Sequence, residues 1–263
     1  MFLGIDIGSS SSKAVLINRK KEIAAIAVIN FGTGTNAPEK ALKRALKETG
    51  AEEKDIEYTV ATGYGRITYE KANKRITEIT CHAKGVTLLA EGVRTIIDIG
   101  GQDAKVIKLN ETGQVEHFVM NEKCAAGTGR FLEVMARVFG CKLDELSRLA
   151  SKSEKEISIS SICTVFAESE VISHLAAGEA IADVAHGVSV SIAKRVAGLC
   201  NRIGYEPKIV MTGGVALNKN VVDALAKELD SCIEVVQHCQ AAGAIGAALL
   251  AYENGIKEKR NGE

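Results

Sequence analysis

The sequence predicts an α/β fold in which one domain architecture occurs twice along the chain. The first observation is an internal repeat: residues 4–16 (GIDIGSSSSKAVL) and 96–108 (IIDIGGQDAKVIK) both contain D-I-G, four further residues and a lysine. The second is that each copy has an apolar run before its glycine and an alternating, β-branched run after it, typical of two strands joined by a turn. The third is that segments with helical spacing follow each copy.

In the first half of the chain, the repeat leads through a polar turn at 18–22 (NRKKE) to a third strand. Residues 38–50 (PEKALKRALKETG) predict a short amphipathic helix, because a proline stands at its start and a glycine at its end. Residues 56–62 predict a strand that enters the loop GYGR at 63–66.

The second half begins in the same order, with the turn NETGQ at 110–114 before another strand. A strand over 208–212 runs into a pair of glycines, and a short strand is expected over 233–236. Helical spacing of apolar or small residues predicts the remaining elements, namely 130–139, 164–177, 184–203 and 240–253.

Composition limits the classes of function. The chain is 46% hydrophobic and 25% charged, as in ordinary soluble globular proteins. Its 33 basic and 33 acidic residues cancel, so nothing in the charge balance favours nucleic acid or an anionic membrane as a partner. The start MFLGIDIGSS has the pattern of a strand, not of a secretory signal, and no apolar run approaches the length of a membrane helix. We therefore expect a cytoplasmic protein.

The turn of the first repeat is a candidate phosphate site. Gly8 lets the chain turn sharply, and successive N–H groups in such a turn form an anion-binding concavity. Lys13 adds a positive charge, and Asp6 at the strand end can hold Mg²⁺ through water. Hydroxyl donors come from Ser9, Ser10, Ser11 and Ser12.

The second copy supplies the matching residues Asp98, Gly100, Gly101 and Gln102. One copy alone would favour an ordinary hairpin turn, whereas two matched copies favour a site that holds a polyphosphate from both sides. The pattern G-x-x-x-x-G-K-[ST] of a Walker loop does not occur. Gln102 is the candidate to orient the attacking water, and Asp6 and Asp98 are the candidate carboxylates for the metal. The alternative is that all three residues brace the hairpins.

Cysteines form the second candidate site. The chain has seven cysteines and no C-x-x-C pair, which excludes a zinc ribbon or a ferredoxin-type run. Cys124 and Cys163 each stand directly before a helical stretch, and a helix N-terminus favours thiolate. Small residues after Cys124, including Gly127 and Gly129, would let inorganic sulfide approach the backbone. Position alone is equally compatible with two small core residues, which is the expected role of Cys81, Cys141, Cys200, Cys232 and Cys239.

Three segments together resemble the actin, heat-shock chaperone and sugar-kinase ATPases. GIDIGSSSSK (4–13) and IIDIGGQDAK (96–105) resemble their phosphate hairpins, and VMTGGVALN (210–218) resembles their adenosine segment. The resemblance implies two ribonuclease-H-like domains with ATP in the cleft, the last helix returning to the first domain. Domain I would span 1–91 plus about 243–263, and domain II 92–242. The nucleotide-binding residues would then include Gly213, Gly214, Asn218 and Gln240.

The resemblance narrows to one family. DIGGQD (98–103), NEKCAAGTGRF (121–131), CTVFAESEVIS (163–173) and TGGVALN (212–218) resemble the activators, or archerases, of 2-hydroxyacyl-CoA dehydratases. This implies a homodimer that shares one [4Fe–4S] cluster, each subunit supplying Cys124 and Cys163. It also implies ATP/ADP and Mg²⁺ as ligands, a separate dehydratase as partner, and a reduced ferredoxin or flavodoxin as electron source.

The expected function is therefore ATP-dependent donation of one electron to a dehydratase. Related ATPase subunits of benzoyl-CoA reductases share much of the pattern and are the nearest alternative. A small-molecule kinase on the same fold would leave Cys124 and Cys163 unexplained, and a chaperone-like binding module would need a peptide-binding domain that the sequence lacks.

Overall fold

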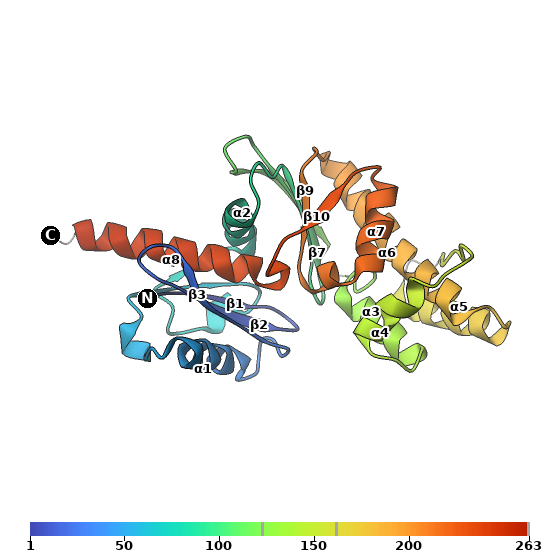
Figure 1. The fold of residues 1–263 in the computed structure, drawn as a ribbon, viewed down its shortest axis with the longest axis horizontal. Helices are drawn as coiled ribbons and strands as arrows, with labels where there is room; N and C mark the ends of the chain where they lie inside the picture. Colours follow the sequence, from blue (N-terminus) through green and yellow to red (C-terminus); the bar gives the residue numbers. More distant parts are fainter. Residues whose placement is uncertain (122–123, 161–162, 262–263) are drawn as a thin grey trace. The chain divides into compact units, whose positions relative to one another are not determined.

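The computed structural model describes residues 1–121, 124–160 and 163–261. It divides the chain into two compact units, shown as a ribbon in Figure 1. The first comprises Met1–Val93, Leu109–Glu116 and Val236–Glu263, and the second comprises Arg94–Lys108 and His117–Val235. Residues 109–116 thus group with the first unit, whereas the sequence limits assign them to the second. Six residues lie outside the described residues: Glu122 and Lys123 of the segment NEKCAAGTGRF, Ser161 and Ile162 directly before Cys163, and the last two, Gly262 and Glu263.

The first unit contains a five-stranded sheet in which β1 is central, antiparallel to β2 and parallel to β4. Its strands alternate between two buried faces. Leu3 and Leu16 pack with helix α1 (Ala37–Thr49) on one face, and Phe2 and Val15 pack with helix α8 (Ala242–Asn261) on the other. The strand order is β3 (Ile23–Ile29), β2 (Ser12–Ile17), β1 (Phe2–Ile7), β4 (Tyr58–Thr62) and β5 (Lys74–Arg75).

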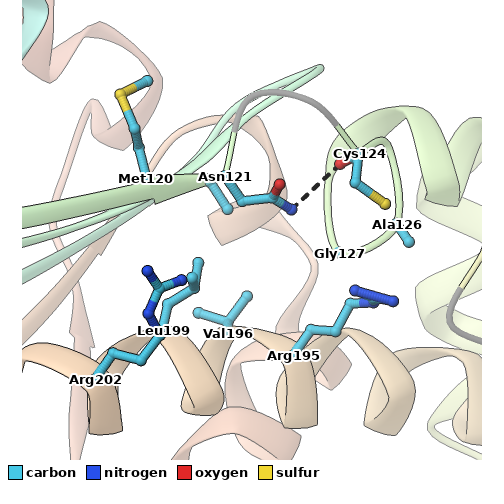
Figure 2. A pocket seen from close by; sticks show the side chains of 10 residues that line it. Met120, Asn121, Cys124, Ala126, Gly127, Arg195, Val196, Leu199 and Arg202 are labelled. Carbon is cyan, nitrogen blue, oxygen red and sulfur yellow. Dashed lines mark hydrogen bonds between the residues drawn. The ribbon is translucent and has the colours of Figure 1, made fainter.

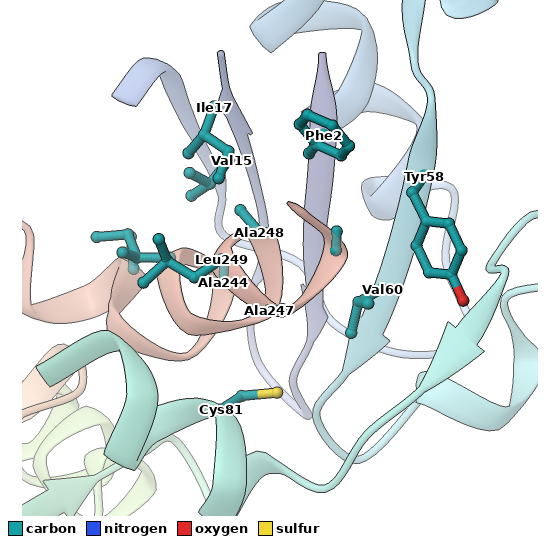
Figure 3. Packing of buried hydrophobic residues seen from close by; sticks show 13 residues of the cluster. Phe2, Val15, Ile17, Tyr58, Val60, Cys81, Ala244, Ala247, Ala248 and Leu249 are labelled. Atoms are coloured by element: carbon teal, nitrogen blue, oxygen red, sulfur yellow. The ribbon is translucent and has the colours of Figure 1, made fainter. Parts of the chain in front are cut away.

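Helix α8 approaches this sheet and helix α2 (Glu78–Leu89) very closely. A Cβ atom on Gly4 of β1 or on Gly246 of α8 would overlap backbone atoms of the neighbouring element. Figure 3 shows the alanines of α8 packed against Phe2 and Val60 of the sheet. The small residues expected over 240–253 are therefore the contact face of the last helix.

The second unit repeats this plan, since β6 is central, antiparallel to β7 and parallel to β9. The order is β10 (Ile233–Val235), β9 (Ile209–Thr212), β6 (Thr95–Ile99), β7 (Ala104–Leu109) and β8 (Val115–Asn121). Read from β8, it matches the order of the first sheet read from β3, which confirms the duplicated α/β fold.

The helices of the second unit are α3 (Gly129–Val138), α4 (Leu143–Ala150), α5 (Thr164–Ala176), α6 (Ile181–Ile203) and α7 (Lys219–Glu228). Short 3₁₀ turns lie at Glu53–Asp55, Arg66–Thr68 and Cys239–Ala241 in the first unit and at Gly214–Leu217 in the second. Helices α2, α4 and α7 have no counterpart among the elements expected from the sequence. In the described part of the chain, no helix combines the length and apolar character that crossing a bilayer requires.

Candidate functional site

The hairpin of β1 and β2 holds the first candidate phosphate turn. Asp6 and Lys13 are register partners across the hairpin, and the Lys13 Nζ lies 3.1 Å from the Asp6 Oδ2. The Gly8 N–H donates to the Ser11 carbonyl at 3.0 Å, which closes the turn. Ser9, Ser10 and Ser11 are half-buried, and Ser12 is buried at the start of β2. The paired side chains brace the two strands while the turn keeps its polar groups partly accessible.

The hairpin of β6 and β7 has the same brace with an additional contact. The buried carboxylate of Asp98 lies 3.3 Å from the Lys105 Nζ through its Oδ2, and its Oδ1 accepts from the Thr212 hydroxyl at 2.9 Å. Lys105 also pairs with Asp103, whose carbonyl accepts from the Gly100 N–H. Gln102 is exposed at the tip of this turn, between Gly101 and Asp103. Asp98 thereby ties the hairpin to the end of β9.

The two glycines after β9 are next to this carboxylate. Gly213 has a φ of 85°, and a Cβ there would lie 2.9 Å from the Asp98 Oδ1, so only glycine fits this turn. Gly214 begins the following 3₁₀ turn. The side chain of Asn218 accepts from the Val221 N–H at 3.2 Å and so caps α7. Gln240 lies elsewhere, in the 3₁₀ turn before α8 in the first unit.

The loop of Cys124 is bonded directly to the second hairpin. The Gly129 N–H donates to the Gly100 carbonyl at 2.9 Å, and the Arg130 N–H donates to the Gly101 carbonyl at 2.7 Å. These are the first N–H groups of α3, which have no partner within the helix itself. Backbone carbonyls of this candidate phosphate turn therefore bind the helix that follows Cys124.

Cys124 also lines a cavity of about 230 Å³ within the second unit. Figure 2 shows Arg195 and Arg202 extending from α6 on the side of the cavity opposite the Cys124 loop. Gly127 has a φ of 85°, and a Cβ there would lie 3.2 Å from the Arg195 Cδ, so glycine lets the arginine stem pass beneath the loop. The remaining lining residues are Ala104, Met120, Asn121, Ala126, Val196 and Leu199. Two guanidinium groups in one cavity favour the binding of an anionic group within that cavity.

Cys163 is the N-cap residue of α5 and is exposed. Helix α5 contacts α3, so the helices that begin after the two cysteines are neighbours. Among the described residues, no three His, Cys, Asp or Glu side chains are grouped to hold a metal ion. The described part of one chain therefore does not by itself bring together the four thiolates that a cubane cluster needs.

The other cysteines have a different setting. Burial raises the pKa of Cys81 and of Cys200 to about 12, which keeps both thiols protonated. Burial also raises the pKa of Cys141, and the nearby Glu145 adds to the effect. Cys239 is buried as expected, whereas Cys232 is exposed, so the expectation that Cys232 is a core residue was wrong. A protonated, buried thiol is a poor metal ligand, so Cys81 and Cys200 are poor candidates to hold a metal.

Four residues of these sites were not expected from the sequence: Asp103, Arg195, Arg202 and Thr212. Asp103 lies in the repeat, and Thr212 directly precedes the paired glycines, so both carried a local signal. Arg195 and Arg202 are seven residues apart on one helix, a spacing that places them on one face. No sequence pattern near these arginines indicated that this face of α6 would lie against the Cys124 loop.

The family model described as the BadF/BadG/BcrA/BcrD ATPase family matches residues 3–251. The chain is 52% identical to the "Activator of lactoyl-CoA dehydratase" of Anaerotignum propionicum over 97% of this chain and 99% of that protein. It is 32% identical to a benzoyl-CoA reductase subunit of Thauera aromatica, over 94% and 91% of the two chains.

Solved structures give the same result. The activator of the 2-hydroxyisocaproyl-CoA dehydratase from Clostridium difficile, with bound ADPNP, superposes with a TM-score of 0.96 at 47% identity, covering 99% of this chain and 98% of that one. A ROK family glucokinase from Streptomyces griseus is 13% identical with a TM-score of 0.60, covering 96% and 99%. The second likeness concerns the fold alone, and it confirms the expected actin-like ATPase architecture.

Proposed function

The chain belongs to the BadF/BadG/BcrA/BcrD ATPase family, and we propose that it is an ATP-dependent activator that donates single electrons to a 2-hydroxyacyl-CoA dehydratase. The observation that carries the proposal is the pair of backbone hydrogen bonds from Gly129 and Arg130 to the turn of the second hairpin. This contact links a candidate phosphate turn to a candidate cluster ligand within one compact unit.

ATP is the nucleotide we assign to the two hairpins. The turn that begins at Gly8 and the turn that begins at Gly100 are the segments we assign to its phosphates. The ADPNP bound to the C. difficile relative supports a nucleotide of this kind. The carboxylates of Asp6 and Asp98 are each paired with a lysine of their own hairpin, so they brace the two strands. Mg²⁺ would therefore contact them through water. Gln102, exposed at the tip of its turn, would orient the attacking water. The other nucleotide contacts would come from Gly213, Gly214, Asn218 and Gln240.

Hydrolysis would reach Cys124 through the second hairpin. A phosphate bound at the turn would be held by backbone N–H groups of that turn. Because these groups share peptide units with the carbonyls of the turn, binding would also move the carbonyls of Gly100 and Gly101. Those carbonyls hold the first turn of α3, so α3 and the loop before it must follow. A segment with two arrangements, one for each nucleotide state, would make electron delivery directional.

Cys124 and Cys163 would hold the cluster. When bound, a [4Fe–4S] cluster supplies a carrier for one electron. Cys163 fits such a group because it is the N-cap of α5. Cys124 does not directly precede a helix as expected, since the N-cap of α3 is Thr128, but it lines a cavity with two guanidinium groups that the small-residue loop at Gly127 leaves open. Since one chain offers two thiols, a second copy would supply the other two about a twofold axis. A reduced ferredoxin or flavodoxin would be the electron source, and the cytoplasm the site of action.

The alternative of a benzoyl-CoA reductase component is less well supported. The chain is 52% identical to an activator and 32% identical to the reductase component, each over more than nine-tenths of its length. No contact among the described residues favours a kinase. Kinase activity would also give no role to Cys124 and the cavity that it lines.

Metal analysis combined with an activation assay tests the proposal. Anaerobically purified protein is expected to contain about four iron and four sulfide for every two chains. Mixed with an inactive 2-hydroxyacyl-CoA dehydratase and a one-electron reductant, it should restore activity with ATP and not with ADP. Absence of iron, or activation that is equal with ADP, would contradict the proposal. The control omits the activator and retains reductant and ATP.

A further inference from the structure

One arrangement of side chains occurs in both sheets, at the end of the central strand. Asp98 of β6 and Thr212 of β9 are register partners in the second unit. Asp6 of β1 and Thr62 of β4 are register partners in the first. Each aspartate is paired with a lysine across its own hairpin, and each threonine precedes a glycine of positive φ. The duplication of the fold therefore extends to the residues beside the two candidate phosphate turns.

The two arrangements differ in the hydrogen bond of the threonine. The Thr212 hydroxyl donates to the Asp98 Oδ1 at 2.9 Å. The Thr62 side chain is 0% exposed, and its hydroxyl oxygen has no hydrogen-bond partner among the described residues. Buried hydroxyls in folded proteins are normally bonded, so the Thr62 hydroxyl needs an explanation. The first unit thus has an open hydrogen-bonding position where the second has a closed one.

This open position lies beside the Asp6 carboxylate. The strand residues that pack with α8 alternate along the sheet, and the period of two places Asp6 and Thr62 on that same face. A Cβ atom on Gly63 would overlap the Asp6 Oδ1, so the backbone directly after Thr62 runs past the carboxylate. Burial raises the pKa of Cys81, the Thr62 hydroxyl lowers it and the Asp6 charge raises it, so both side chains lie near this thiol. A thiol is only a weak hydrogen-bond partner for the hydroxyl.

One water molecule can bridge the two side chains. Neighbouring strands lie about 4.8 Å apart, and two hydrogen bonds of about 2.8 Å each span such a gap. The carboxylate of Asp6 and the hydroxyl oxygen of Thr62 both accept hydrogen bonds, and a water molecule has two protons to donate. Mg²⁺ keeps several of its waters when it binds nucleotide phosphates, so a water on the metal suits this position.

We propose that Thr62 is a positioning residue for the Mg²⁺ of the bound nucleotide: its hydroxyl oxygen accepts a hydrogen bond from a Mg²⁺-bound water that also donates to Asp6. This inference rests on the proposed function, since it requires the nucleotide with its metal. In the second unit the corresponding hydroxyl, that of Thr212, holds Asp98 instead. The threonine of the first unit is therefore the one that acts on the metal.

Two substitutions separate the hydroxyl from the shape of the side chain. Thr62→Val keeps the branched shape without the oxygen, and Thr62→Ser keeps the oxygen without the methyl group. The measurement is a titration of the holoprotein and ADP with Mn²⁺, which replaces Mg²⁺ and is detected by electron paramagnetic resonance. We expect Thr62→Val to weaken Mn²⁺ binding about fivefold, the loss of one ordinary hydrogen bond. Thr62→Ser should bind Mn²⁺ like the wild type, and ADP affinity in EDTA should be unchanged in both.

Thermal unfolding gives a second readout, in which a purely structural hydroxyl would behave differently. Replacing an unpartnered buried hydroxyl by an apolar group of the same shape is neutral or stabilising. Without nucleotide, Thr62→Val should therefore melt at or above the wild-type temperature. With ADP and Mg²⁺, it should gain less stability than the wild type. If Thr62→Val does not fold, Thr62→Ala provides the comparison of Mn²⁺ affinities.

The matched control is Tyr69→Phe, which removes another buried and unpartnered hydroxyl of the first unit. Tyr69 packs with Ile5 and Ile7 on the opposite face of the sheet, so its loss should leave Mn²⁺ affinity unchanged. Wild-type Mn²⁺ affinity in Thr62→Val, or an equal loss in Thr62→Val and Thr62→Ser, would overturn the inference while the proposed function stands. ADP affinity that falls equally with Mg²⁺ and with EDTA would also overturn it. A wild-type protein that binds neither ADP nor Mn²⁺ would instead refute the proposed function.

Discussion

Cys163→Ser is expected to abolish cluster binding, with iron falling from about four per two chains to near zero. Serine presents a hard, protonated hydroxyl where a soft thiolate is required, and a twofold assembly would lose two of its four ligands at once. Cys124→Ser should have the same effect, because its thiol lines the cavity that faces Arg195. The measurements are iron content and visible charge-transfer absorption after anaerobic purification.

The control for both variants is Cys232→Ser. Cys232 is exposed and lies between α7 and β10, so its loss should leave iron content and absorption unchanged. If Cys124→Ser and Cys163→Ser both keep the complete cluster, these residues are not its ligands.

Asp98→Asn is expected to reduce ATP hydrolysis by a factor on the order of 100, the scale seen when one preorganised polar group of an active site is removed. The buried carboxylate joins Lys105 of the hairpin to Thr212 of β9, and the amide cannot replace its charge. Breaking a buried ion pair costs about 3–5 kcal/mol of folding free energy, so thermal unfolding should also shift downward. Turnover and the melting temperature are measured with and without ADP.

Asp144→Asn is the matched control for this change. Asp144 forms an exposed ion pair with Arg148 on α4, and such pairs contribute only about 0.3–0.5 kcal/mol. It should leave hydrolysis and melting close to wild type. A folded Asp98→Asn protein with unchanged ATP affinity and unchanged turnover would remove Asp98 from the nucleotide site.

The repeat predicted much of the fold because its pattern is local. D-I-G, four residues and a lysine place the aspartate and the lysine opposite each other across a hairpin, and both pairs are register partners in the structure. Helical spacing predicted α3, α5 and α6 to within a few residues of their ends. In these segments the buried face is encoded by consecutive residues.

What the sequence did not predict depends on distant contacts. Asp98 and Thr212 are 114 residues apart in the chain, and no periodic pattern pairs them. The bond from Gly129 to Gly100 joins two backbone groups, which leave no signature in the side chains. Helix α2 was missed because its buried face depends on close packing with α8, where Gly85 lies against Ala242. The cavity shared by Cys124 and the arginines of α6 was also missed, because only the tertiary fold brings these distant residues together.

The central claim is that ATP acts on the cluster ligands through the second hairpin. The most direct test is the rate at which an iron chelator extracts iron from the protein with ADP and with a non-hydrolysable ATP analogue, with the mass in solution followed in parallel. We expect a dimer from which iron is extracted at rates that differ severalfold between the two nucleotides. The difference should shrink in Gly129→Ala, whose Cβ would lie 3.1 Å from the Gly100 carbonyl oxygen and disturb the link. Equal rates with both nucleotides, or a monomer that retains a complete cluster, would contradict it.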